Sequence, residues 1–544
     1  MSESSNVKNG AHLNAEDSES NSTIPRPSLG TELWEAWKNG AGMFCESYVV
    51  FAVGNVTNIW KILYSSCFPG KPIGELVPCN DQILSAIPFV EIAAIIFGML
   101  LFGLLADHLG RLWGSRCTVA LMLLGDIGIT IAFGVNLTGQ LVMFTIFIIL
   151  FSMGVGGEYP MASSTASERS EAHQLKRGRT VILTFAMQGW GNFINTAIIC
   201  ILLLITQTGG CSSAYLNIMN DTLTGQCDAS GLEVVWRVQY ALALPVILWL
   251  FSMRFCVFKE NEVWVKRQKS KYQLESPTEL RARRWKHTKM LFGRKYISPL
   301  IGTCVGWFVW DIAFYGNKLF QGTIMNSIVG GASNVNLLLV MDYTLLNSFI
   351  SLIGYYFAAF TIDYKWMGRV RMQIMGFTVT FIISIICGFD YVEVSSNPQL
   401  FLFLYLIQSF FMQWGPNSTT WLLPVELFPT DVRTQAHGMA ASSGKLGALV
   451  ASLIFSYANS GGAVSSSVIF IVSGFSCLVG ALVTIIFVKD VTGVPLMHID
   501  RRWSEDFNAA YGPGASGTAA DKKVEEARED EDNTTNNNFQ IEKV

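Results

Sequence analysis

The 544-residue sequence contains few charged residues: Asp, Glu, Lys and Arg make up 15% of it, whereas soluble globular proteins carry about 25%. Hydrophobic residues account for 51% and aromatic residues for 12%. This composition argues against a secreted, nucleic-acid-binding or ordinary cytosolic protein and indicates a chain solvated largely by lipid. The net charge of −3 carries little information, because the side of the membrane on which charges lie matters more than their sum.

The two ends of the sequence lack long apolar runs. Residues 1–32 contain no apolar core flanked by basic residues, so no signal peptide is expected. We expect residues 1–40 to form a disordered cytosolic arm and residues 490–544 a largely disordered cytosolic tail, both regulatory or targeting, because neither buries enough apolar surface to fold alone. Outside the apolar segments no nucleophile–base pair or metal cluster is recognised, so an enzyme, a metal site or a cofactor is not expected.

Apolar segments of roughly 20 residues, the length that spans a bilayer, occur twelve times. They begin near Gly42, Ile83, Arg116, Gln140, Arg179, Val234, Ile297, Val335, Met372, Leu400, Gln435 and Ser465. The hydrophilic stretch 258–296 divides them into six and six. The sequence therefore predicts an all-α membrane protein with bundles at residues 41–257 and 297–489, joined by a cytosolic linker loop at 258–296.

Lys and Arg residues predict the orientation, because they favour short cytosolic loops. The linker holds twelve of them, and the loops on the same face hold several more. Both termini are thus expected in the cytosol. The basic linker can be a topology signal alone or can also bind anionic lipid.

Eleven cysteines and two glycosylation triplets give a second test of orientation. Four cysteines fall in loops assigned to the oxidising outer side, where two disulfides can form with a pairing that the sequence leaves open: Cys67, Cys79, Cys211 and Cys227. The other seven lie in or beside spans and are expected to be apolar fillers. The triplets at Asn136 and Asn220 also fall outside and are candidates for glycosylation.

A short turn after the second span places Asp107 close to Gly110 and Arg111. A similar but less complete motif after the eighth span contains Asp363 and Arg369. The repeat at about half the chain length supports internal duplication. The turn resembles the cytosolic gating loop of the major facilitator superfamily, which latches two bundles together. The resemblance implies solute transport by alternating access, with these five residues at the cytosolic gate.

Few ionisable residues remain within the spans, chiefly Glu46, Glu158, Asp311, Glu426 and Lys445. Each costs about 2.5–3.5 kcal/mol at the centre of a spanning helix, so each is a functional candidate for handling protons or anions. Two structural alternatives stay open. Glu158 can be a hydrogen-bonded group near the interface, and Lys445 can be fixed in an ion pair between helices.

Polar and aromatic residues accompany these groups. Trp307, Asp311 and Tyr315 recur every four residues and so share one helical face. Gln188 can orient a polar solute or join two helices. Asn417 follows a Gly-Pro break that frees backbone groups for a solute, or that only kinks the helix.

Five segments in order resemble the phosphate:proton symporter family of fungi and plants: Gly-Gly-Glu-Tyr-Pro, Met-Gln-Gly-Trp-Gly, Trp-Asp-Ile-Ala-Phe-Tyr-Gly, Gly-Pro-Asn-Ser-Thr-Thr and Ser-Gly-Lys-Leu-Gly. The resemblance implies that phosphate is surrounded by Tyr159, Gln188, Trp307, Asp311, Tyr315 and Asn417, with Lys445 nearby. It also implies proton coupling through Glu46, Glu158 and Asp311.

The sequence departs from that family at Val49, where the family usually has a second acid in the first span. Loss of this acid looks more like the related glycerophosphodiester permeases. The leading hypothesis is a plasma-membrane importer of inorganic phosphate driven by protons. A glycerophosphodiester or another organic anion is the alternative substrate, and a nutrient sensor with the same fold is the third hypothesis. The expected partners are a small anion, protons and the bilayer, without nucleic acid.

Overall fold

The computed structural model describes residues 28–64, 81–109, 111–172, 176–211, 229–257, 277–319, 321–328, 337–460 and 466–512. Within these ranges every regular element is a helix. Nine helical segments among them are long and apolar enough to cross a membrane. Three further spans carry more polar residues or are interrupted.

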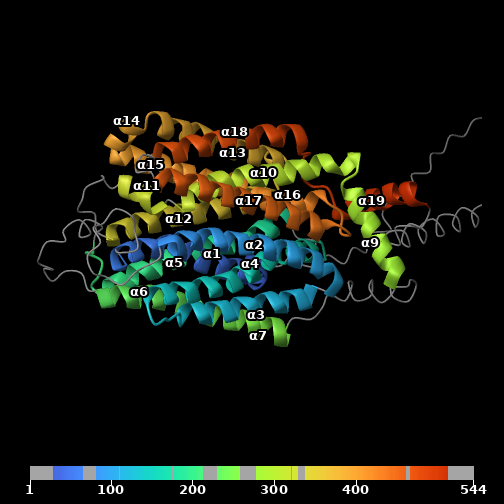
Figure 1. Ribbon diagram of the computed structural model, residues 1–544. Coiled ribbons are helices and arrows are strands. Elements are labelled where there is room, and N and C mark those ends of the chain that lie inside the picture. The colour runs from blue at the N-terminus through green and yellow to red at the C-terminus, as the bar shows by residue number, and fades with distance from the viewer. Residues whose placement is uncertain are drawn as a thin grey trace, which may run out of the picture.

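The first bundle contains six spans (Figure 1). They are α1 (Leu29–Leu63), α2 (Asp81–Leu109), α3 (Arg111–Thr130), α4 (Leu137–Ala172), α5 (Arg177–Ile205) and a composite of α6 (Ala229–Ala241), α7 (Leu244–Ser252) and the π-helix η3 (Met253–Val257). Glycines allow these helices to approach closely. A Cβ on Gly156 of α4 would lie 2.2 Å from the Ile95 carbonyl oxygen of α2, and one on Gly154 would lie 2.5 Å from that of Thr118 in α3.

The second bundle contains the other six spans. They are α10 (Arg294–Leu319), α12 (Leu337–Thr361), α13 (Gly368–Phe389), a composite of α15 (Pro398–Met412), the π-helix η4 (Gln413–Asn417) and α16 (Ser418–Leu427), then α17 (Arg433–Ser460) and α18 (Ser466–Phe487). The twelve-span, two-bundle architecture predicted from the sequence is therefore confirmed. Short helices α11 (Gln321–Ile328) and α14 (Tyr391–Ser396) lie between spans.

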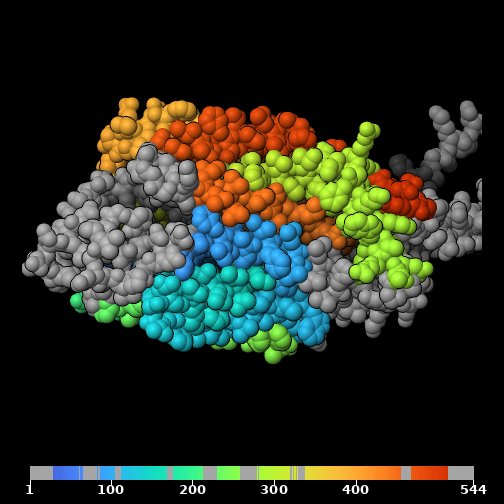
Figure 2. Space-filling view, viewed as in Figure 1, coloured from blue at the N-terminus to red at the C-terminus, as the bar shows by residue number. Residues whose placement is uncertain are grey.

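The two bundles pack side by side, and their surfaces meet along the length of the molecule (Figures 1 and 2). Helix α5 packs on α12, and α2 packs on α17. A Cβ on Gly189 of α5 would lie 2.8 Å from the ring of Tyr355 in α12. Side chains at the middle of this interface are consequently shared between the bundles.

Helices α9 (Pro277–Leu291) and α19 (Leu496–Tyr511) lie at one end of the molecule, called here the α19 end. Trp503 of α19 donates a 3.0 Å hydrogen bond from Nε1 to His287 Nδ1 of α9. Asp500 accepts a 2.7 Å hydrogen bond from the backbone N–H of Thr430. The tail segment after residue 490 is thus docked on the linker and the second bundle.

Two predicted boundaries differ from the structure. Helix α1 begins at Leu29, so residues 29–40 of the expected disordered arm are helical. The expected disordered tail, 490–544, contains α19 at its start. The prediction rested on the polar average composition of the tail. That average does not reveal the apolar face of this helix, on which Leu496, Trp503 and Phe507 are buried. The tail beyond residue 512 lies outside the described residues.

Cys211 is disulfide-bonded, as predicted for this loop, while Cys67, Cys79 and Cys227 lie outside the described residues. The seven cysteines expected to be fillers are all free. Asn136 is exposed, and its side-chain oxygen accepts a 2.7 Å hydrogen bond from the N–H of Gly139 in the first turn of α4. Asn220 lies outside the described residues.

Candidate functional site

Three helices of the first bundle place polar side chains at the centre of the molecule. The Tyr159 hydroxyl of α4 donates a short hydrogen bond to Oε1 of Glu46 in α1. The Gln188 amide of α5 lies 3.4 Å from Oε2 of the same carboxylate. All three side chains are at most 3% exposed. Burial at this depth is costly unless such groups are hydrogen-bonded, which these are.

The second bundle supplies a cation and a second carboxylate. Nζ of Lys445 in α17 donates a 2.8 Å hydrogen bond to the Tyr315 hydroxyl and lies 3.3 Å from Oδ2 of Asp311, both on α10. The same ammonium lies 4.9 Å from the ring centroid of Tyr159 in the first bundle, within the range of a cation–π contact. Lys445 therefore faces both halves of the site.

Two residues link the halves by hydrogen bonds. The Tyr355 hydroxyl of α12 donates to Oε1 of Gln188 at 2.8 Å and accepts from Nδ2 of Asn417 at 2.6 Å. Asn417 also accepts from Trp310 Nε1 at 3.0 Å and donates to Gln413 Oε1 at 2.6 Å. The helix break predicted here is confirmed, since Gly415 has non-helical φ and ψ angles of −110° and −110°.

An aromatic layer adjoins this network. The Trp307 ring centroid lies 6.4 Å from that of Tyr159 and 5.6 Å from that of His437. The structure thus brings together all seven residues predicted to bind substrate, with Glu46 beside them. Sequence reasoning missed Tyr355, because nothing near it in the chain distinguishes it from a packing aromatic.

Glu158 lies elsewhere in the first bundle. Arg254 of η3 forms a two-pronged ion pair with it, with 2.5 Å between each pair of nitrogen and oxygen atoms. Thr118 of α3 donates a further 2.6 Å hydrogen bond. The Glu158 and Arg254 side chains are 1% and 6% exposed. This geometry favours the structural alternative over proton coupling.

The Arg254→Gln variant is expected to lose about 3–5 kcal/mol of stability, because it leaves Glu158 buried without its counter-charge. The double variant with Glu158→Gln and Arg254→Gln should recover much of this loss, since neither charge remains. Thermal unfolding in detergent measures both effects. If the double variant is as unstable as Arg254→Gln, the loss does not come from the unpaired Glu158 charge and the structural assignment is wrong.

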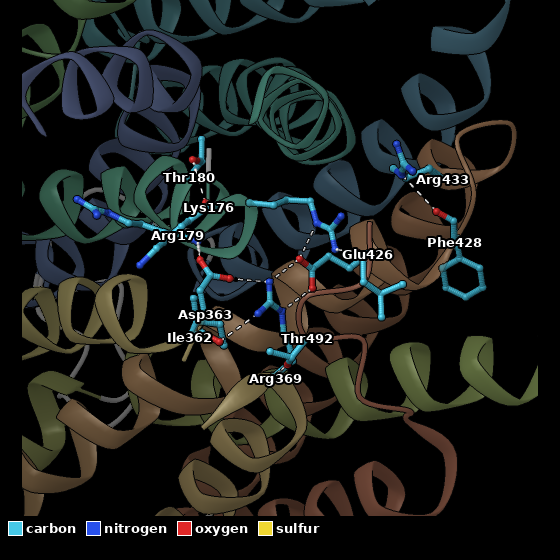
Figure 3. Close-up of polar contacts among 12 residues, drawn as sticks. Lys176, Arg179, Thr180, Ile362, Asp363, Arg369, Glu426, Phe428, Arg433 and Thr492 are labelled. Atoms are coloured by element: carbon cyan, nitrogen blue, oxygen red, sulfur yellow. Dashed lines mark hydrogen bonds and ion pairs between the residues drawn. The ribbon is translucent and has the colours of Figure 1, made fainter. Parts of the chain in front are cut away.

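A second buried cluster of charges joins the bundles at the α19 end (Figure 3). Nη2 of Arg369 lies 2.8 Å from Oδ1 of Asp363, and its Nε lies 2.7 Å from Oε2 of Glu426. From the first bundle, Arg177 Nε lies 2.8 Å from Oε1 of Glu426, and the N–H of Arg179 donates to Asp363 at 2.9 Å. This cluster is called the inter-bundle gate below.

The gate contains two of the five predicted gating residues, Asp363 and Arg369. Gly110 and the side chains of Asp107 and Arg111 lie outside the described residues. Glu426 was predicted to handle protons or anions but lies in the gate, where it is 0% exposed. Only the fold brings it to Arg177, which is 249 residues away in the chain.

Two six-span bundles around a shared buried polar site, held at one end by ion pairs, define a membrane transporter of the major facilitator fold. Solved structures agree. The proton:xylose symporter XylE of E. coli matches with a TM-score of 0.65 at 17% identity, covering 88% of this chain and 100% of that one. The E. coli fucose:proton symporter matches with a TM-score of 0.52 at 12% identity, covering 82% and 97%.

Sequence comparison is more specific. The family described as "sugar (and other) transporter" matches residues 42–503. Inorganic phosphate transporter 1-11 of Oryza sativa subsp. japonica is 30% identical, covering 76% of this chain and 77% of the relative. Probable inorganic phosphate transporter 1-6 of Arabidopsis thaliana is 29% identical, covering 77% and 84%. The chain belongs to the sugar (and other) transporter family and, within it, to the group of these inorganic phosphate transporters.

Proposed function

We propose that this protein imports inorganic phosphate together with protons across the plasma membrane, with the α19 end and both termini in the cytosol. The observation that carries the proposal is the Lys445 ammonium, which lies between the two halves of a buried site that also contains Asp311 and Glu46. A fixed cation suits an anionic substrate. The names of the relatives agree with phosphate as that anion.

The proposed coupling is a competition for Lys445. While Asp311 is ionised, its carboxylate forms an ion pair with the Lys445 ammonium. A proton on Asp311 removes that negative charge, so that Lys445 can attract phosphate instead. A proton on Glu46 lowers the repulsion between the site and the anion in the same way. Loss of these protons on the inner side restores the Asp311–Lys445 pair and expels phosphate.

The other site residues would bind the phosphate oxygens. Gln188, Trp307, Tyr315 and Asn417 each carry a donor group, and they come from both bundles. Phosphate bound among them would link the bundles, and a rocking motion of residues 41–257 against 297–489 would carry it across. The gate would close the cytosolic exit while the outer side opens.

The proposed orientation is supported by helix α9, which carries several cations at the α19 end. They are Arg281, Arg283, Arg284, Lys286 and Lys289. Cations near the ends of spans favour the cytosolic side.

Purified protein in liposomes tests the function. An inward proton gradient should drive accumulation of labelled phosphate, and a protonophore should abolish it. Val49 is buried and apolar where the family usually has an acid, which keeps glycerophosphodiesters as a second candidate substrate. Uptake of labelled glycerophosphocholine that excess phosphate does not inhibit would favour that substrate. Anion binding without any turnover would instead favour a sensor.

A further inference from the structure

Glu91 is a buried carboxyl that has no role in the site described above. Glu91 of α2 is 2% exposed, and its Oε1 has no hydrogen-bond partner among the described residues. A charged or unsatisfied carboxyl in an apolar interior is costly, and an ionisable group within a spanning helix is a functional candidate for that reason. Packing alone gives no reason for a glutamate here.

Glu91 lines a cavity of about 20 Å³. This volume is enough for about one water molecule. The polar side chains around it come from both bundles, namely Asn55, Asn192, Tyr315, Lys318 and Gln321. The cavity is therefore polar enough to hold water, and Glu91 is the carboxyl in its wall.

The direction of the helices places this cavity. Helix α1 starts at the α19 end, where Glu32 pairs with Arg179 at 3.0 Å, and Asn55 lies near its other end. Helix α10 likewise runs away from that end, and Lys318 is in its last turn. The cavity thus lies between the central site and the end of the molecule opposite α19. In the proposed orientation this is the outer side.

Tyr315 lies between the cavity and the central site and contacts both. Its side chain lines the cavity, and its hydroxyl accepts the hydrogen bond from Lys445. Lys318 is one helical turn further out and donates to Gln321 at 3.4 Å. The Tyr315 side chain therefore separates a proton in the cavity from the Lys445–Asp311 pair.

We propose that Glu91 is an additional proton-carrying residue, which takes a proton from the outer side and passes it through the water of this cavity to the central carboxylates. The transfer is balanced: protonated Glu91 becomes a carboxylate as Glu46 or Asp311 gains the proton. This inference rests on the proposed proton-coupled transport.

The charges that face Glu91 are consistent with such a relay. Glu46 of α1 is close enough to repel the Glu91 carboxylate, and Tyr240 of α6 also lies near it. From α10, Tyr315 and Lys318 share its cavity. Two ionised carboxylates repel in a buried region, so a proton on one favours ionisation of the other. Protonation of Glu91 and of Glu46 is thereby coupled.

The test compares Glu91→Gln with wild type in liposomes. Gradient-driven phosphate accumulation should fall about 10²-fold, the usual order for loss of a positioned proton carrier, with a changed pH profile. Exchange of labelled for unlabelled phosphate needs no net proton movement and should stay at the wild-type rate. Glu91→Asp should restore part of the accumulation. Glu393→Gln, at an exposed position, is the matched control.

Wild-type accumulation and an unchanged pH profile in Glu91→Gln would overturn the proposal. So would a parallel loss of exchange, which would make Glu91 structural. If the wild type itself accumulates no phosphate, the proposed function fails, and infrared spectroscopy of the purified protein decides the role of Glu91. A carboxyl band whose intensity changes with pH should be present in wild type and absent from Glu91→Gln. Identical bands would reject protonation of Glu91.

Discussion

Replacing Asp311 by Asn is expected to lower gradient-driven phosphate accumulation by about 10²–10⁴-fold, the range for loss of a positioned proton-transferring group. Asn keeps the size of the side chain but cannot bind or release a proton. In wild type the carboxylate lies 3.3 Å from the Lys445 ammonium. Without the ionisable group at position 311, the affinity of Lys445 for phosphate should depend much less on the proton gradient.

Labelled phosphate uptake into liposomes, with and without a pH gradient, measures this effect. Exchange at equal pH is the informative second readout, because Lys445 is still present to bind the anion. The matched control is Asp390→Asn, at an exposed position after α13 whose side chain makes no capping hydrogen bond. Robust accumulation by Asp311→Asn would refute the competition for Lys445.

Replacing Glu426 by Gln is expected to open the inter-bundle gate. The wild-type carboxylate is 0% exposed and accepts from Arg369 and from Arg177 at 2.7–2.8 Å. Removing one partner of a buried ion pair typically costs about 3–5 kcal/mol, because the remaining charge stays buried without compensation. These contacts join the bundles in the state described here, so we expect the substitution to destabilise that state relative to one that is open at the α19 end.

A Thr434→Cys substitution reports opening of the gate. Thr434 is 2% exposed near the contact between α2 and α17, so a cysteine there becomes accessible only when the bundles separate. Maleimide labelling of its peptide, followed by mass spectrometry, should be markedly faster in the Glu426→Gln background. Glu505→Gln is the control. Glu505 pairs with Arg501 on the surface at 3.0 Å, and such pairs contribute about 0–1 kcal/mol. Equal labelling in all three backgrounds would show that Glu426 does not hold the gate.

Much of the fold was predictable because insertion into lipid depends on local composition. Each apolar segment predicts its own span, and the positions of Lys and Arg predict its direction. Helical periodicity is local as well, so Trp307, Asp311 and Tyr315 could be assigned to one face from their spacing.

The partners of the charged groups could not be predicted. Glu158 and Glu46 are both acids within spans, yet one lies against Arg254 and the other in the central network. Glu426 was grouped with them but belongs to the gate. The relevant neighbours lie between 57 and 249 residues away in the chain. Tyr355 carried no local signal that separates it from a packing aromatic.

The sequence by itself determined the number of spans, the division into two bundles and the small set of ionisable residues that lipid insertion makes expensive. These are properties of short segments and their composition. The tertiary structure decided which of those residues face one another: Lys445 with Asp311, Glu158 with Arg254, and Glu426 with Arg369 and Arg177. Helix crossing and rotation set such pairings, and these follow from the packing of the whole bundle.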